Sequence, residues 1–143
     1  MIVRSPITRY AGGSREPDTP QVLSYEKRTM AMTLIANWSY PTAIWFGAGR
    51  ISELAKACQQ AGIRRPLMVT DRGLARLPIT QDALARLDDA GLNTALFSEV
   101  DPNPTEINME AGLYAYISGG HDGVIAFGGG SGLDLGKVIA FMV

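Results

Sequence analysis

The residues best suited to chemistry are three glycines and a serine, Gly128 to Ser131, near the C-terminal end of the sequence. The apolar run before them, 124–127, favours β-structure and is too short for a buried helix, so it predicts a buried strand. Ser131 can cap a following helix. Strand, glycine turn and helix bring backbone N–H groups and the positive end of a helix dipole together, which predicts a phosphate site. The apolar side of that helix recurs at i, i+3, i+4 and i+7 and comprises Leu135, Val138, Ile139 and Met142.

Glycine suits this turn because a Cβ would keep a ligand away from the amides and because the turn is expected to need positive φ. A flexible linker is the alternative, but linkers do not usually join a buried strand directly to a helix. Two well-known glycine motifs are excluded. In G-x-G-x-x-G, counted from Gly128, the third glycine falls on Leu133, and in the P-loop pattern Val138 replaces the hydroxyl that follows Lys137.

Asp71 is the second candidate, because it stands at the expected carboxyl end of the strand 66–70. Ligands of open parallel sheets bind outside those strand ends. A carboxylate there can accept both hydroxyls of an adenosine ribose and repels a 2′-phosphate, which favours NAD over NADP. The alternative is a helix N-cap for the segment 73–77, and one aspartate can serve both purposes.

An earlier glycine turn, 47–52, offers another place for a dinucleotide. Ser52 stands where the third glycine of the dinucleotide fingerprint belongs, which weakens the match. Asp71 nevertheless follows Gly49 by about 22 residues, close to the spacing of a ribose-binding carboxylate. Spacing alone leaves this alternative open.

The scaffold that must position these residues alternates strands with helices. Such alternation predicts an α/β fold with a parallel sheet, right-handed crossovers and helices on both faces. The expected strands are 42–46, 66–70, 93–98 and 124–127, and the expected helices are 51–61, 80–90, 106–118 and the one after Ser131. The third of these helices is expected to turn Ile107, Ala111, Tyr114 and either Ile117 or Ser118 toward the sheet.

Length and composition indicate one ordinary globular domain with a real core, since 46% of the 143 residues are apolar and 19% are charged. A net charge of −1 gives no basic field for nucleic acid and no polybasic patch for a membrane. Residues 1–33 lack periodicity and are expected to be a poorly ordered tail, with Met30 a candidate for the true start. No run is long enough to span a membrane and no secretory signal is present, which favours the cytoplasm.

Two reactive residue types are expected to be structural. Cys58 is the only cysteine, which excludes an internal disulfide and fits a reducing compartment, and its apolar neighbours suggest a core thiol. His121 is the only histidine, and it precedes a strand at its amino end, away from the expected site. Asp122 is expected to be a turn residue. One histidine cannot by itself make the ligand shell of iron or zinc.

The pattern Gly128-Gly129-Gly130-Ser131-x-x-Asp134-x-x-Lys137 resembles the GGGSxxDxxK signature of the iron-containing (group III) alcohol dehydrogenases, relatives of glycerol dehydrogenase and dehydroquinate synthase. The resemblance implies a Rossmann-like, dehydroquinate synthase-like N-terminal domain over 34–143. It also implies that Gly129, Gly130 and Ser131 hold the diphosphate of NAD(P), with Asp134 near the nicotinamide. The family often has an aspartate where Asp71 stands and a V-x-P-N-P-T segment bordering the cofactor, which implies a contact for Asn103. An Asx turn is the alternative for Asn103.

The function implied is metal-dependent, NAD(P)-linked interconversion of alcohols with aldehydes or ketones. In the family, the ligands of Fe²⁺ or Zn²⁺ and a TTxGTGSE-like stretch lie in a helical second domain downstream, and the sequence ends within an expected helix. The chain is therefore expected to be a fragment that is inactive alone, of an enzyme whose full-length form can be a homo-oligomer. The alternatives are a dehydroquinate-synthase-like lyase fragment and a non-enzymatic nucleotide-binding or assembly module.

Overall fold

A computed structural model describes residues 1–4 and 43–143 of the chain. One compact unit joins residues 1–7 to Phe46–Val143, and a second, Thr8–Trp45, is described only at residues 43–45. No helix in the described part of the chain is both long enough and apolar enough to cross a membrane.

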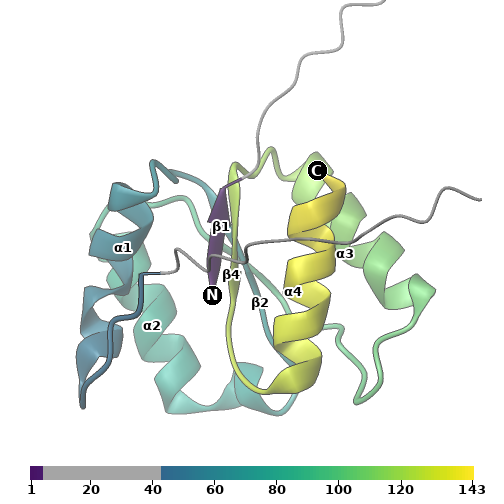
Figure 1. The fold of residues 1–143 in the computed structure, drawn as a ribbon, viewed down its shortest axis with the longest axis horizontal. Coiled ribbons are helices and arrows are strands. Elements are labelled where there is room, and N and C mark those ends of the chain that lie inside the picture. The colour runs from purple at the N-terminus through teal and green to yellow at the C-terminus, as the bar shows by residue number, and fades with distance from the viewer. Residues whose placement is uncertain (5–42) are drawn as a thin grey trace, which may run out of the picture. The chain divides into compact units, whose positions relative to one another are not determined.

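The centre of the fold is a four-stranded sheet in the order β1-β4-β2-β3. Figure 1 labels three of these strands, β1, β4 and β2. Strand β2 lies parallel to both β3 and β4, whereas β1 runs antiparallel to β4. All four residues of β2 and of β4 are buried, as expected for strands covered on both faces. The strands are β1 (Ile2–Arg4), β2 (Pro66–Val69), β3 (Ala95–Phe97) and β4 (Gly123–Ala126).

Helices cover both faces of this sheet, with α1 and α2 on one side and α3 and α4 on the other (Figure 1). Alternate residues of β2 pack into the hydrophobic clusters on opposite faces of the sheet. Leu67 and Val69 face α3 and α4, and Met68 faces α1 and α2. The helices are η1 (Arg50–Glu53), α1 (Leu54–Gln60), η2 (Leu74–Arg76), α2 (Pro78–Asp89), α3 (Glu106–Ser118) and α4 (Gly130–Met142). The predicted α/β architecture with helices on both faces is confirmed.

The sheet reverses its direction of growth between β2 and β4. From β2 the chain passes through α2 to the neighbouring β3, and then through α3 to β4 on the opposite side of β2. Val69 and Ala126, the last residues of β2 and β4, pair with each other, so the two strands end side by side. The segments after β2 and β4 therefore diverge from adjacent strand ends, which is the topological switch point where α/β sheets bind ligands.

Two predictions for the N-terminal part of the chain need correction. The expected strand 42–46 is wrong over residues 43–46, which have no regular structure, and residue 42 lies outside the described residues. Strand propensity needs a sheet edge to pair with, and the outer edge of β4 is taken by β1. The expected tail 1–33 differs at Ile2–Arg4, which form β1, while 5–33 lie outside the described residues.

The expected inner faces of two helices also need correction. In α3 the large apolar residues Ile107, Tyr114 and Ile117 are 76%, 74% and 65% exposed. The buried row is instead Asn108, Gly112 and Tyr116, because α3 approaches α4 so closely that a Cβ on Gly112 would collide with Ile139. In α4 the expected residues Leu135 and Ile139 are buried, but Val138 and Met142 are largely exposed, and Gly132, Gly136 and Ala140 complete the inner face.

Candidate functional site

The glycine turn connects β4 to α4 at the carboxyl end of the sheet. Gly128 has φ +121°, a conformation that side chains rarely adopt, so positive φ is confirmed at one position of the turn. Gly129 is the N-cap of α4, Gly130 is its first residue, and no side chain from the described residues caps the helix. The first-turn amides therefore lie at an exposed, uncapped helix N-terminus, as anion binding requires.

The glycines of this turn divide into two kinds. A Cβ on Gly128 would lie 2.6 Å from Leu74 Cδ2, and one on Gly132 would lie 3.2 Å from the carbonyl oxygen of Phe127. These two positions are occupied by glycine because the chain packs closely there. A Cβ on Gly129 or Gly130 would meet nothing within 4 Å, so the space beside these two residues is open to a ligand.

Ser131 does not cap the helix, contrary to the prediction. The helix begins one residue earlier, at Gly130, and the Ser131 hydroxyl donates to the carbonyl oxygen of Pro102 at 2.5 Å. This bond ties the first turn of α4 to the loop that follows β3. Asn103 is exposed and directly follows Pro102, the residue whose carbonyl oxygen accepts this bond.

Asp71 lies at the adjacent strand end, directly after β2. Its Oδ1 accepts the backbone N–H of Leu74 at 2.8 Å, which is the capping role considered above. Its Oδ2 lies 3.8 Å from the position that a Cβ would take on Gly128. The carboxylate therefore caps the turn that leaves β2 with one oxygen and borders the glycine turn with the other.

A buried asparagine that sequence reasoning missed organises the loop after β3. Asn108 donates through Nδ2 to the Glu99 carbonyl oxygen at 3.0 Å and to Asp101 Oδ2 at 3.1 Å. Its Oδ1 accepts the backbone N–H of Thr105 at 2.9 Å, so one side chain holds both ends of the loop 101–105. The available signal was an asparagine three residues after a threonine at the start of an expected helix, which is the spacing of a capping box.

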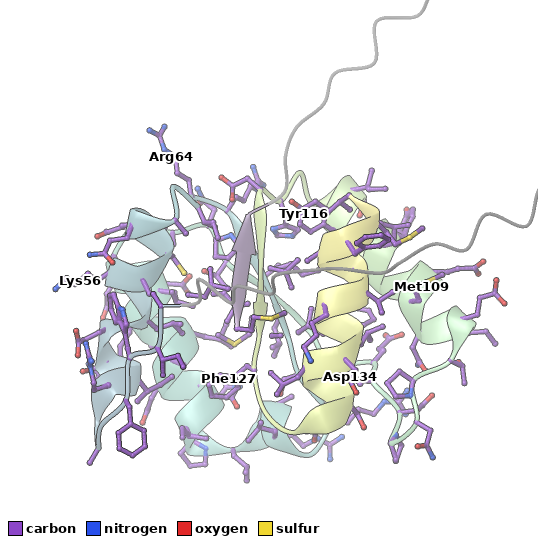
Figure 2. The ribbon with its side chains drawn as sticks, in the orientation of Figure 1. Lys56, Arg64, Met109, Tyr116, Phe127 and Asp134 are labelled. Atoms are coloured by element: carbon purple, nitrogen blue, oxygen red, sulfur yellow. The ribbon has the colours of Figure 1, made fainter. Side chains whose placement is uncertain are left out.

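Asp134 lies one turn into α4, and Figure 2 shows it near the same end of the sheet as Phe127, which precedes the glycine turn. It is exposed and pairs with Lys137 at 3.2 Å.

The N-terminal amine, just before β1, also lies at this end of β4. The Met1 ammonium donates to the Ala126 carbonyl oxygen at 2.9 Å. Burial, with a smaller contribution from the positive charge of Lys137, lowers the pKa of that amine.

The remaining candidates lie elsewhere. His121 is at the amino end of β4, where Nδ1 lies 3.0 Å from the Arg65 carbonyl oxygen, and the Asp122 carboxylate accepts backbone N–H groups of Arg64 and Arg65. Figure 2 shows Arg64 at the opposite end of the molecule from Phe127 and Asp134. Cys58 is fully buried, and burial raises its thiol pKa to about 11, which agrees with a core thiol.

The described residues contain no group of three or more His, Cys, Asp or Glu side chains placed to hold a metal ion. The residues described here therefore do not fit an iron or zinc centre. The site at the carboxyl end of the sheet brings together Asp71, the loop around Asn103, and the glycine turn, with Asp134 one turn further along α4.

Comparison with known proteins identifies the family of this chain. The sequence model of the family described as "iron-containing alcohol dehydrogenase" matches residues 41–143. A 4-hydroxybutyrate dehydrogenase from Cupriavidus necator is 41% identical over 103 residues, which are 72% of this chain and 26% of that protein.

Solved structures give the same result. The crystal structure of a 1,3-propanediol oxidoreductase superposes with a TM-score of 0.62 at 36% identity, over 65% of this chain and 24% of that one. A sulfoacetaldehyde reductase from Bifidobacterium kashiwanohense, solved in complex with NAD⁺, superposes with a TM-score of 0.61 at 26% identity, over 74% and 28%. The chain thus spans about a quarter of the length of these relatives. It belongs to the iron-containing alcohol dehydrogenase family.

Proposed function

We propose that residues 34–143 are the nucleotide-binding portion of a metal-dependent, NAD(P)-linked alcohol dehydrogenase that interconverts alcohols with aldehydes or ketones. The observation that carries the proposal is the open backbone of Gly129 and Gly130 at the uncapped start of α4, beside the switch point between β2 and β4. An anion held there gains backbone hydrogen bonds and the favourable end of the helix dipole.

The site residues have distinct proposed roles. The amides of the first turn of α4 bind the diphosphate, and the carboxylate of Asp71 accepts the adenosine ribose hydroxyls through the oxygen that borders the glycine turn. Asn103 contributes a polar contact from the loop tied to Ser131. The proposed cofactor-binding residues are Asp71, Asn103, Gly129, Gly130, Ser131 and Asp134.

NAD is the proposed cofactor, in preference to NADP. A carboxylate at the ribose repels the 2′-phosphate of NADP and favours the free 2′-hydroxyl of NAD. Two relatives support this choice, since one is the sulfoacetaldehyde reductase solved with NAD⁺ and another is described as an NADH-dependent butanol dehydrogenase.

The metal ligands are proposed to lie in a helical second domain outside this chain, as the resemblance to the family implies. The described residues hold no suitable cluster. A divalent Fe²⁺ or Zn²⁺ in that domain would act as a Lewis acid toward the alcohol oxygen. The substrates are small alcohols and aldehydes, the compartment is the cytoplasm, and the full-length form can be a homo-oligomer. Neither nucleic acid nor a membrane is a proposed partner.

A second candidate, an assembly module without a cofactor, draws support from the exposed apolar side chains on α3 and α4. Tyr114 is 74% exposed and Phe141 is 87% exposed. Sedimentation combined with dinucleotide titration separates the two candidates. A monomer that binds NAD fits the enzyme portion, whereas a defined complex with no NAD affinity fits the module.

The direct test is the Gly130→Val variant of the full chain, titrated with NAD⁺ by calorimetry. The added side chain enters open space, so circular dichroism stays close to wild type, while the branched side chain blocks the amides and NAD⁺ binding is lost. Glu106→Val is the matched control, because Glu106 is the exposed first residue of α3. It leaves NAD⁺ affinity unchanged. Equal affinity of wild type and Gly130→Val would remove the glycine turn as the site.

A further inference from the structure

Thr70 is a buried polar residue at the site whose hydroxyl none of the proposed contacts uses. It stands between Val69, the last residue of β2, and Asp71, and its side chain is 0% exposed. Its backbone N–H donates to the Phe97 carbonyl oxygen at 3.0 Å, which fixes the residue in place. Among the described residues, however, its Oγ1 has no hydrogen-bond partner.

The orphaned hydroxyl faces the glycine turn. Thr70 Oγ1 lies 3.5 Å from the position that a Cβ would take on Gly128, and Thr70 Cα lies 3.5 Å from the corresponding position on Gly132. The same point on Gly128 is 3.8 Å from Asp71 Oδ2. The hydroxyl is thus aimed at the turn that carries the proposed phosphate contacts, next to the proposed ribose carboxylate.

Thr80 shows that a buried threonine in this fold can satisfy its hydroxyl. It too is 0% exposed, but its Oγ1 donates to the Leu74 carbonyl oxygen at 2.7 Å. Burying a hydroxyl without a partner destabilises a protein, and most buried polar atoms are paired. The unpaired hydroxyl of Thr70 therefore calls for a partner that the described residues do not supply.

We propose that Thr70 is a further cofactor-binding residue, whose hydroxyl donates a hydrogen bond to the diphosphate of the bound dinucleotide, directly or through one ordered water. The inference rests on the proposed function and adds a contact from beneath the turn. Gly128 is exposed and has no side chain, so a small shift of its peptide opens a path between the hydroxyl and a phosphate oxygen. Ligand binding then satisfies a group for which the described residues supply no partner.

The test uses Thr70→Val in the full chain, which keeps the shape of the side chain and removes the hydroxyl. We expect one effect on stability and a separate effect on NAD⁺ binding. The urea midpoint of the ligand-free chain stays the same or rises, because an unpaired polar group is lost. The Kd for NAD⁺ rises about 12- to 150-fold, the loss of one hydrogen bond to a charged acceptor. Thr70→Ser restores the hydroxyl and brings the Kd back to within about twofold of wild type.

Thr80→Val is the matched control, since it removes a hydroxyl that is paired. It lowers the urea midpoint and leaves the Kd for NAD⁺ unchanged. Adenosine, which has no phosphate, serves as the second ligand in an NMR titration. Its affinity for Thr70→Val equals its affinity for wild type.

The outcomes separate this inference from the proposed function. Failure of the wild-type chain to bind NAD⁺ overturns the proposed function. Normal NAD⁺ binding by both wild type and Thr70→Val overturns only the role of Thr70. If Thr70→Val weakened the binding of NAD⁺ and of adenosine equally, the hydroxyl would contact the ribose, and the diphosphate contact would be overturned. A lower urea midpoint for Thr70→Val would show that the hydroxyl already has a partner in the free chain.

Discussion

At the scale of single residues, Asp71 combines a structural and a proposed binding role through its two oxygens. Oδ1 caps the Leu74 N–H at 2.8 Å, and Oδ2 borders the glycine turn. An uncharged amide can keep the cap, because its oxygen accepts the same N–H, but it no longer repels a phosphate. The two roles are therefore separable by substitution.

We expect Asp71→Asn to narrow the preference for NAD over NADP, mainly through tighter binding of NADP. Stability should change little, because the amide oxygen replaces Oδ1 at the cap. Asp71→Ala should narrow the same preference and also lower the free energy of unfolding by about 1 kcal/mol, because the cap is lost. Titration with both dinucleotides and urea unfolding measure the two effects.

The control for this pair is Asp88→Asn, which removes an exposed carboxylate from α2. It should leave the ratio of the two dissociation constants unchanged. An unchanged ratio in Asp71→Asn as well would reduce Asp71 to a cap.

Sequence patterns located the site residues better than they explained them. The glycine turn, Asp71 and the loop around Asn103 were all predicted to border one end of the sheet, and the structure places them there. Ser131 was assigned to a cap because serine is a frequent capping residue, but the cap position falls on Gly129. Thr70 lies in the predicted strand 66–70, and a lone hydroxyl in such a run reveals nothing about its partners until the fold is known.

At the scale of the elements, helix α4 packs against strand β4 almost backbone to backbone. A Cβ on Gly136 would lie 2.6 Å from Ala126 Cβ and 3.2 Å from Ala126 Cα. Neither atom can rotate away. The close approach brings the start of α4 down to the strand end, where the glycine turn joins them.

Gly136→Ala should therefore destabilise the chain by about 1–3 kcal/mol, the usual cost of overpacking, even though alanine favours helix more than glycine does. Gly130→Ala is the matched control in the same helix, because its Cβ meets nothing within 4 Å. It should be neutral or slightly stabilising. Urea unfolding measures both variants, and equal stability for the two would contradict the close packing of α4.

The helix faces show where periodicity fails as a guide. Amphipathic patterns assume that large apolar residues mark the buried side, and this assumption predicted Ile107 and Tyr114 for α3. Close helix contact instead places Gly112 inside, between Asn108 and Tyr116 on the buried row. The large side chains of Ile107, Tyr114 and Ile117 remain exposed. Propensity likewise suggested a strand at 42–46, but pairing depends on which edges of the sheet are available, and sequence alone does not specify that.

At the scale of the whole molecule, the chain carries a predicted binding site without a metal site among its described residues. It spans about a quarter of the length of its relatives. The proposed function assigns dinucleotide binding and metal chemistry to different parts of a family protein.

The purified chain is accordingly expected to bind NAD⁺ but to form no NADH from small alcohols, with or without added Fe²⁺ or Zn²⁺. Absorbance of NADH follows the reaction, and calorimetry on the same sample verifies that the dinucleotide is bound. NADH formation that increases with added metal would show that this chain can assemble a catalytic centre by itself.

The two kinds of glycine in the turn leave different traces over evolutionary time. A copy of this gene released from ligand binding would still need Gly128 and Gly132 to fold, whereas nothing would prevent mutation from replacing Gly129 and Gly130. Substitutions at positions 129 and 130 would therefore indicate that a related sequence has lost ligand binding. Both positions are glycine in this sequence.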